Sequence, residues 1–313
     1  MSAAAASLVG LTRTFGDITA VDGLTFDVSP GELFGIVGPD GAGKTTTLRM
    51  LAGVLRPSRG EVTVAGVDVR ADPEAVKARI AYMAQRFGLY EDLTVAENID
   101  FYADLYRGPK SERPARLERL YEFSRLGEFR DRLAGNLSGG MKQKLSLSCS
   151  LVHTPEVLLL DEPTFGVDPI SRRELWLILH EMVHEGVTVL VSTAYLDEAE
   201  RCDRVVMMHE GRALALDRPE ALQQSLAGSM LSLRTDRPRD ARDLLRGTSG
   251  VESATLFGDV VHALMPSRDD VTAVRALEEG GIAVLEVESI EPSLEDVFIH
   301  LVRAEDRAPQ IHA

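Results

Sequence analysis

Short runs of aliphatic and β-branched residues alternate with amphipathic stretches from about residue 5 to residue 220. The four strongest runs are residues 32–38 (ELFGIVG), 156–161 (EVLLLD), 187–192 (VTVLVS) and 204–209 (RVVMMH). The first three are apolar at nearly every position, which is typical of strands buried on both faces. Strands that alternate with helices predict a mostly parallel sheet, so we expect an α/β domain over residues 5–220.

The chain between residues 90 and 140 follows a different pattern. Apolar residues recur at every third or fourth position in LTVAENIDFYADLY and ERPARLERLYEFSRLGEF. This spacing indicates amphipathic helices. We therefore expect a helical subdomain, over about residues 88–145, that is inserted between strands of the sheet.

A second region follows the segment DRPEALQQSLAG. Residues 229–303 read as strand, helix, strand, strand, helix, strand and helix, and the first six match the order of a ferredoxin-like split βαβ unit. No catalytic constellation is found there. We expect a small α+β accessory domain over residues 229–303, followed by a frayed tail over residues 304–313.

Composition excludes some classes of protein. The 313 residues suffice for one large and one smaller domain, and the formal net charge of −15 argues against a nucleic-acid binder with a broad basic surface. Cys149 and Cys202 lack metal-ligand spacing, so we expect no disulfide and a reducing, cytosolic setting. The N-terminus does not resemble a secretory signal, and no stretch approaches the roughly 20 apolar residues that span a bilayer.

The segment GPDGAGKTT, residues 38–46, matches the phosphate-loop pattern G-x-x-x-x-G-K-[ST], between an apolar run and a helix-like stretch. Glycines let backbone N–H groups turn toward phosphates, and a helix N-terminus adds a favourable dipole. Lys44 is expected to reach the terminal phosphates, and the Thr45 hydroxyl is expected to ligate Mg²⁺. The candidate nucleotide-binding residues are Gly38, Pro39, Asp40, Gly41, Ala42, Gly43, Lys44, Thr45 and Thr46.

Two adjacent carboxylates end the apolar run in EVLLLDEPT. Neighbouring side chains of a strand point to opposite faces, so we expect Asp161 and Glu162 to have different roles. Asp161 would hold the Mg²⁺ shell, and Glu162 would orient and deprotonate the attacking water. A strand that ends in solvated acidic residues is the alternative, and the nearby phosphate loop favours the catalytic interpretation.

The segment NLSGGMKQ begins as a turn and continues as a helix. Ser138 is an N-cap type of residue, and Gly139 and Gly140 expose backbone N–H groups at a positive helix end. A second anion site and an ordinary capped helix explain these residues equally well.

The motifs GPDGAGKTT, LSGGMKQ, LLLDEPT and GVDP, in this order, closely resemble those of the ATP-binding subunit of ABC transporters. The resemblance covers residues 5–220, and EPSLEDVFIHL looks like the C-terminal extension of bacterial drug, antibiotic and polysaccharide export ATPases. It implies a P-loop NTPase fold, ATP and Mg²⁺ as cofactors, and a peripheral location on the cytoplasmic face of the membrane. The implied partners are an integral membrane permease and a second ATP-binding subunit, identical or different, with no nucleic acid.

The resemblance also implies roles for single residues. Each ATP would lie between the phosphate loop of one chain and residues 138–140 of the other. Gln85 in YMAQRFGLY is similar to the catalytic glutamine that joins Mg²⁺ or the water to the helical block. Asp168 in GVDP resembles the residue that contacts the partner's site. Phe15 resembles the aromatic that stacks on adenine, and a core aromatic is the alternative.

One residue departs from the family pattern in the segment VSTAYLDEAE. Ala194 occupies the position where the family usually has a histidine that contacts the γ-phosphate. Loss of one positioned donor costs roughly 3 to 4 kcal/mol where the donor is essential, so we expect ATP binding with slowed hydrolysis. Such a weakened cassette would pair with a second ATPase that keeps its histidine, whereas in a homodimer both sites would lack the group. Asp40 in place of Asn or Ser, and Val167 in place of Leu, are milder departures.

Three functions follow from this pattern. The leading hypothesis is an export ATPase that moves a permease docked on FGLYEDLTVAENI, with Phe87, Leu89 and Tyr90 as contact residues. Packing within the helical block is the alternative for these three residues. The other two functions are a soluble ABC ATPase that acts on ribosomes or nucleic acid, and a nucleotide switch that hardly hydrolyses ATP.

Overall fold

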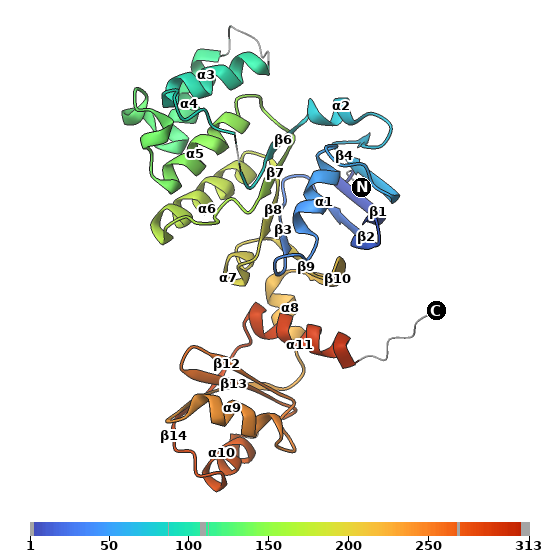
Figure 1. The fold of residues 1–313 in the computed structure, drawn as a ribbon, viewed down its shortest axis with the longest axis vertical. Coiled ribbons are helices and arrows are strands. Elements are labelled where there is room, and N and C mark those ends of the chain that lie inside the picture. Colours follow the sequence, from blue (N-terminus) through green and yellow to red (C-terminus); the bar gives the residue numbers. More distant parts are fainter. Residues whose placement is uncertain (1–2, 87, 107–110, 112, 268–269, 308–313) are drawn as a thin grey trace. The chain divides into compact units, whose positions relative to one another are not determined.

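The computed structural model describes residues 3–86, 88–106, 111, 113–267 and 270–307. The chain divides into two compact units, and the boundary along the sequence lies between residues 216 and 217. The second unit contains helix α8 (Pro219–Ser225) in addition to the accessory region predicted from residue 229, because α8 packs against helix α11 (Leu294–Arg307) (Figure 1).

A six-stranded sheet forms the centre of the first unit, in the order β10-β9-β3-β8-β7-β6. Its strands are β3 (Leu33–Val37), β6 (Ile80–Met83), β7 (Val157–Asp161), β8 (Thr188–Thr193), β9 (Arg204–His209) and β10 (Arg212–Asp217). The pairs from β9 through β3, β8 and β7 to β6 are parallel, and every residue of β3, β7 and β8 is buried, as the apolar runs predict. The carboxyl ends of β3, β7 and β8 therefore lie together at one edge of the sheet, where α/β proteins place their ligands.

A second, antiparallel sheet flanks the first, and the prediction of a mostly parallel sheet missed it. Its order is β2-β1-β4-β5, with strands β1 (Ala6–Phe15), β2 (Ile18–Val28), β4 (Arg59–Val64) and β5 (Val67–Asp68). Register shifts along β1, near Gly10 with its φ of 58°, interrupt the alternation of apolar and polar positions that would have revealed it. Helix α1 (Lys44–Leu51) packs against strands of both sheets.

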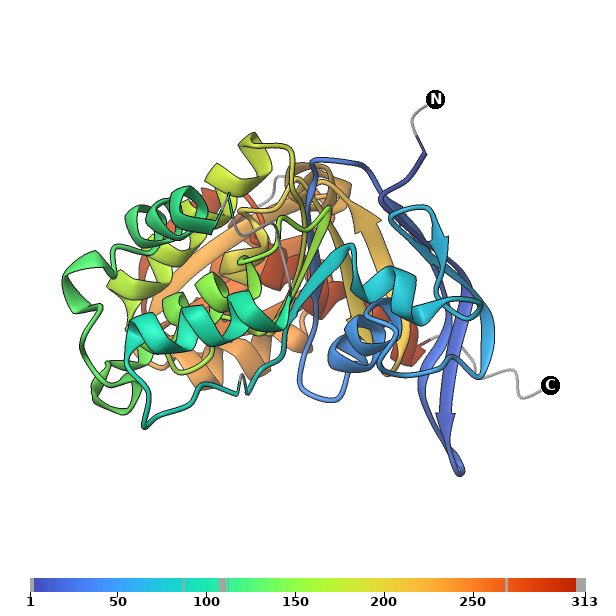
Figure 2. The same ribbon diagram turned by 90° about the horizontal axis from the view of Figure 1, so that it is seen from above.

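The predicted helical insertion lies between β6 and β7. It contains α3 (Val95–Leu105), α4 (Arg113–Ser124), the 3₁₀ turns η1 (Gly127–Phe129) and η2 (Ala134–Asn136), and α5 (Gly139–Ser150). Helix α5 packs against α3, α4 and α6 (Pro169–His184). In both views these helices lie on one side of the first unit, and the blue antiparallel strands lie on the other (Figure 1, Figure 2). The short helices α2 (Pro73–Lys77) and α7 (Leu196–Ala199) complete the unit.

The second unit has the order of elements that the sequence predicts. Its elements are β11 (Ser229–Thr235), α9 (Pro238–Arg246), β12 (Ser253–Phe257), β13 (Val260–Met265), α10 (Asp270–Glu279), β14 (Val284–Ile290) and α11. The strands form an antiparallel sheet in the order β12-β13-β11-β14. The prediction of a tail from residue 304 was wrong at its start, because α11 continues to Arg307. Residues 308–313 of that predicted tail lie outside the described residues.

One buried carboxylate joins α11 to this sheet. Asp296 accepts hydrogen bonds from Ser293 N and Oγ, at 2.9 and 2.7 Å, and its other oxygen lies 3.1 Å from His262 Nδ1 of β13. Burial raises the pKa of Asp296, but the hydrogen bonds from His262 and Ser293 outweigh burial and leave the pKa below its usual value. The ionised form of Asp296 is therefore the form that stabilises this unit.

We expect the stability of the second unit to fall with acidification through Asp296. A lowered folded-state pKa contributes stability above the unfolded value of about 3.9 and loses it as the pH falls through the folded pKa. Asp296→Asn should destabilise the unit by about 1–2 kcal/mol at neutral pH and flatten this acid dependence. Unfolding followed from neutral pH to about pH 3 measures both effects. Equal stability of Asp296→Asn and the exposed control Asp259→Asn would contradict the prediction.

Candidate active site

The loop between β3 and α1 leaves no room for side chains at two of its glycines. A Cβ atom at Gly38 would lie 2.1 Å from the carbonyl oxygen of Met208, and one at Gly43 would lie 2.5 Å from that of Ala20. Gly43, with a φ of 100°, is the N-cap of α1 and provides no side-chain hydrogen bond to it. The N–H groups of the first turn of α1 therefore remain available to an anion, as nucleotide binding requires.

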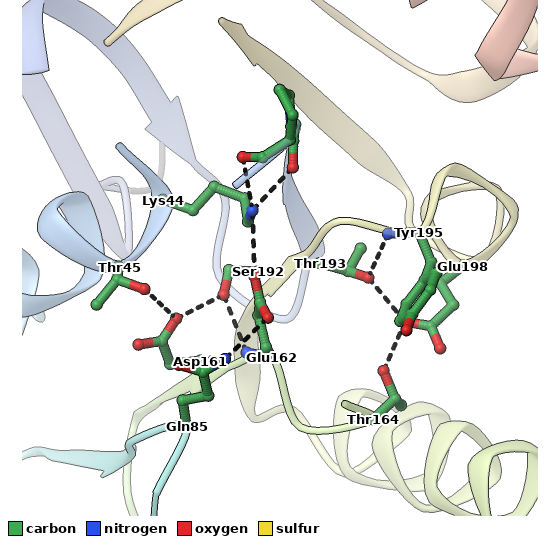
Figure 3. Close-up of polar contacts among 12 residues, drawn as sticks. Lys44, Thr45, Gln85, Asp161, Glu162, Thr164, Ser192, Thr193, Tyr195 and Glu198 are labelled. Atoms are coloured by element: carbon green, nitrogen blue, oxygen red, sulfur yellow. Dashed lines mark hydrogen bonds and ion pairs between the residues drawn. The ribbon is translucent and has the colours of Figure 1, made fainter. Parts of the chain in front are cut away.

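Lys44, the first residue of α1, directly follows this loop and is only 4% exposed. Its Nζ donates hydrogen bonds to the carbonyl oxygens of Gly38 at 2.8 Å and Pro39 at 3.0 Å. The same nitrogen forms an ion pair with Glu162 Oε1 at 3.1 Å (Figure 3). A buried ammonium group with these partners presents a fixed positive charge at the carboxyl edge of the sheet.

Asp161, the last residue of β7, lies beside the first turn of α1. Its Oδ1 accepts hydrogen bonds from Thr45 Oγ1 and from Ser192 Oγ, both at 2.9 Å (Figure 3). The Tyr82 hydroxyl approaches Oδ2 at 3.4 Å. Burial, and next the charge of Asp161, raise the pKa of Tyr82, so the phenol remains a neutral donor. Mg²⁺ binds through one or two carboxylates together with phosphate oxygens, so Thr45 and Asp161 fit this cation.

The prediction that Asp161 and Glu162 point to opposite faces of a strand was wrong. Strand β7 ends at Asp161, and Glu162 has a left-handed backbone with a φ of 49°. Both carboxylates consequently face the start of α1, where Asp161 contacts Thr45 and Glu162 contacts Lys44. Such a conformation costs about 1–3 kcal/mol and is concentrated at functional sites.

Glu162 is held on three sides. Gln85 Nε2 donates to Glu162 Oε2 at 3.1 Å, which brings the predicted glutamine to the predicted general base. The backbone N–H of Glu162 donates to Ser192 Oγ at 3.0 Å, while Lys44 pairs with its other carboxylate oxygen. Gln85 and Lys44 therefore orient the carboxylate of Glu162, and Ser192 fixes its backbone.

Sequence reasoning missed Ser192. This fully buried residue of β8 donates to Asp161 Oδ1 and accepts from Glu162 N, so it connects both carboxylates. The available signal was a hydroxyl at the end of a largely apolar run that ends at the same edge of the sheet as β3 and β7. Two positions later comes the half-buried Ala194, after Thr193, whose carbonyl oxygen accepts from Gly38 N at 3.4 Å. The backbone directly before Ala194 is thus bonded to the first residue of the phosphate loop.

The other predicted anion site lies in the helical block. Ser138 is the N-cap of α5, where its Oγ accepts from Met141 N at 3.3 Å, and both Ser138 and Gly139 are exposed. A Cβ atom at Gly140 would lie 2.3 Å from Ser171 of α6. Helix α5 packs against α3, α4, α6 and the edge strand β6, whereas α1 packs against β7 and β8, which carry Asp161 and Ser192.

Asp168 is exposed and caps α6, accepting from the N–H groups of Ile170 at 3.1 Å and Ser171 at 3.0 Å. The hydrogen bonds from Ser171 are the main cause of a lowered pKa of Asp168, so its carboxylate is ionised. The neighbouring side chain of Phe165 is also exposed. The start of α6 therefore presents an anionic and an apolar group on the surface.

Phe15 ends β1 with 45% of its surface exposed, so the alternative of a core aromatic was wrong. The Arg13 guanidinium lies 4.4 Å from the centre of its ring.

In the candidate docking surface, Tyr90 is exposed and packs edge-on against Phe101 at 4.7 Å, while Leu89 is partly buried. Phe87 lies outside the described residues. No helix in the described part of the chain is sufficiently long and apolar to cross a membrane.

Comparison with known proteins identifies relatives over nearly the whole chain. Residues 21–165 match the family model described as ABC transporter. The chain is 44% identical to the probable multidrug ABC transporter ATP-binding protein YbhF of Escherichia coli (strain K12), over 96% of this chain but only 53% of YbhF. It is 38% identical to the daunorubicin/doxorubicin resistance ATP-binding protein DrrA of Streptomyces peucetius, over 96% of this chain and 94% of DrrA.

The fold matches solved structures as well. A bacterial ABC transporter cassette solved as a dimer aligns with 68% of this chain and 98% of its own, with a TM-score of 0.62 and 25% identity. The chain thus spans almost the full length of DrrA and of this cassette, and about half the length of YbhF.

Proposed function

Because this chain belongs to the ATP-binding proteins of ABC transporters, we propose that it binds and hydrolyses ATP to drive export through a separate membrane permease. The observation that carries this proposal is the meeting of Lys44 with Glu162, and of Thr45 with Asp161, at the start of α1. The names of YbhF and DrrA, which concern multidrug transport and resistance to daunorubicin and doxorubicin, support export of drug-like molecules.

In this proposal the phosphate loop binds the phosphates of ATP, and the exposed ring of Phe15 stacks on adenine. Lys44 exchanges its loop carbonyl partners for terminal phosphate oxygens. Mg²⁺, held by Thr45 and Asp161, would neutralise charge on these phosphates. Glu162 accepts the proton of the attacking water at its carboxylate, and Gln85 holds that carboxylate in place.

The proposal places a second chain opposite the phosphate loop. Ser138 and Gly139 are exposed at the positive end of α5, which suits an anion that arrives from outside the chain. Asp168 and Phe165 would face the partner at the same interface. The dimeric cassette of similar fold supports this arrangement, and the partner is either a second copy or a different ATP-binding subunit.

A mixing experiment tests the shared site. Lys44→Ala removes the phosphate contact, and Ser138→Asp keeps an N-cap residue but places a negative charge against phosphate. Each variant alone should lose ATP hydrolysis. An equimolar mixture should recover part of it, because a mixed dimer contains one intact site built from two chains. Full activity of Ser138→Asp alone, or no recovery in the mixture, would contradict a site shared between two copies of this chain.

The proposed permease contact includes the exposed pair Tyr90 and Phe101 in the helical block. Exposed aromatic side chains are enriched at protein interfaces. Movement of this block would reach the active site through Gln85, since Gln85 contacts Glu162. The proposed location of the chain is therefore the cytoplasmic face of a membrane, bound to its permease.

A slow nucleotide switch is the second candidate function, favoured by Ala194.

A further inference from the structure

Glu198 of α7 is a buried carboxylate that the proposed mechanism does not use, and it is only 1% exposed. Its Oε2 accepts hydrogen bonds from Thr164 Oγ1 at 2.8 Å and from Thr193 Oγ1 at 2.9 Å (Figure 3). Its Oε1 lies 3.3 Å from Arg172 Nε, without the alignment of a hydrogen bond. Three segments therefore meet at one side chain: the turn after Glu162, helix α6 and the end of β8.

Each of these segments borders the candidate active site. Thr164 belongs to the turn that follows Glu162, in which Phe165 N donates to Glu162 O at 3.1 Å. Thr193 ends β8, and its carbonyl oxygen accepts from Gly38 N of the phosphate loop. Arg172 lies in the first turns of α6, the helix that Asp168 caps.

The turn that contains Ala194 is also bonded to the Glu198 carboxylate, through Thr193. Thr193 Oγ1, which donates to Glu198, accepts from Tyr195 N at 3.0 Å, so the residues on both sides of Ala194 are held. The Arg172 guanidinium lies 4.5 Å from the centre of the Tyr195 ring. The backbone of the turn beside the phosphate loop is therefore positioned by Glu198 rather than by any group on Ala194.

A buried carboxylate such as that of Glu198 contributes little net stability to a fold. Removal of a carboxylate from water costs several kcal/mol, and apolar replacements of buried ionic groups are often neutral or stabilising. The two threonine hydroxyls and Arg172 offset that cost only when all three segments are in the observed arrangement. This makes Glu198 suited to selecting one arrangement of the segments around the nucleotide.

We propose that Glu198 is a positioning residue that holds the turn after Glu162 and the turn at Ala194 in register for ATP hydrolysis. The inference rests on the proposed function. Loss of Glu198 should lower kcat while ATP binding, which depends on the phosphate loop, is retained. A misplacement of about 1 Å near reacting groups can cost roughly 100-fold in rate.

The test compares Glu198→Gln and Glu198→Leu with the matched control Glu32→Gln in the full chain. Glu32 is also a buried carboxylate, 7% exposed, which accepts from Ser29 N and faces Arg204 at 3.4 Å. It directly precedes β3, at the edge of the sheet opposite to the phosphate loop. A general effect of removing a buried charge should thus appear in all three variants.

We expect kcat to fall about 100-fold in Glu198→Leu and less in Glu198→Gln, whose amide oxygen still accepts from the threonines, with ATP affinity kept in both. Glu32→Gln should keep its kcat. Amide hydrogen exchange over residues 163–171 and 193–199 should accelerate in Glu198→Leu and not in Glu32→Gln. Unchanged exchange in these two segments would overturn the inference, and so would an unchanged kcat where wild type hydrolyses ATP.

The exchange measurement separates this inference from the proposed function. A wild-type chain that binds but does not hydrolyse ATP would contradict the proposed hydrolysis. In that case, faster exchange in only the two named segments of Glu198→Leu would still support the positioning role. Equal acceleration throughout the first unit would mean that Glu198 supports the fold in general, and it would overturn the role.

Discussion

Glu162→Gln is expected to abolish steady-state ATP hydrolysis while ATP binding is retained. The replacement keeps the shape of the side chain, and its carbonyl oxygen can still accept from Gln85 Nε2. The backbone hydrogen bond to Ser192 Oγ is unaffected, so the strained turn should persist. What is lost is the carboxylate that accepts the proton of water, and general-base catalysis contributes about 100- to 10,000-fold.

Hydrolysis and equilibrium ATP binding of purified wild type and Glu162→Gln measure this effect. Glu156→Gln is a suitable control, because Glu156 directly precedes β7, whereas Glu162 directly follows it. The Glu156 side chain is 61% exposed, and its carboxylate lies 4.0 Å from the Arg79 guanidinium. Equal hydrolysis by wild type and Glu162→Gln would show that Glu162 is not the base. Loss of binding together with hydrolysis would show instead that the Lys44 pair maintains the loop.

Ala194→His is expected to accelerate hydrolysis, by roughly 100-fold if a γ-phosphate donor limits the wild-type rate. The position is half buried and follows Thr193, whose carbonyl oxygen is bonded to Gly38 N. An imidazole there would lie beside the phosphate loop and could donate a hydrogen bond to a phosphate oxygen. The hydrogen bond of Thr193 to Glu198 should keep the turn in place around the larger side chain.

Ala194→Leu is the control for side-chain size, because leucine is larger than alanine but cannot donate a hydrogen bond to phosphate. The double variant Ala194→His, Glu162→Gln should be inactive if the gained rate still depends on Glu162. A rate in Ala194→His no higher than in wild type would mean that another group already supplies this contact. Tight ATP binding by wild type, with turnover appearing only in Ala194→His, would indicate a weakened cassette that works beside a stronger ATPase.

Much of the first unit is predictable because its signals are local. The buried strands β3, β7 and β8 are continuous apolar runs, and the phosphate loop is a short stretch whose glycines have direct steric reasons. The helical insertion follows from the spacing of apolar residues, and the structure adds a capping box between Thr94 and Glu97 at the start of α3. The antiparallel sheet escaped prediction because the register shifts in β1 interrupt its pattern.

The amino-acid sequence by itself determined the buried parallel strands, the helical insertion, the phosphate loop, and the identity of Lys44 and Glu162 as candidate catalytic residues. Only the tertiary structure decided the direction of Glu162, the connecting role of Ser192 and the meeting of three segments at Glu198. The physical reason is distance along the chain. Thr45 and Asp161 are 116 positions apart, and Thr164 and Glu198 are 34 apart, so no local periodicity or propensity records that they meet. Parallel pairing of β3, β8 and β7 brings the carboxyl ends of these strands to one edge of the sheet. Hydrogen bonds among the buried side chains at that edge then select the geometry of the site.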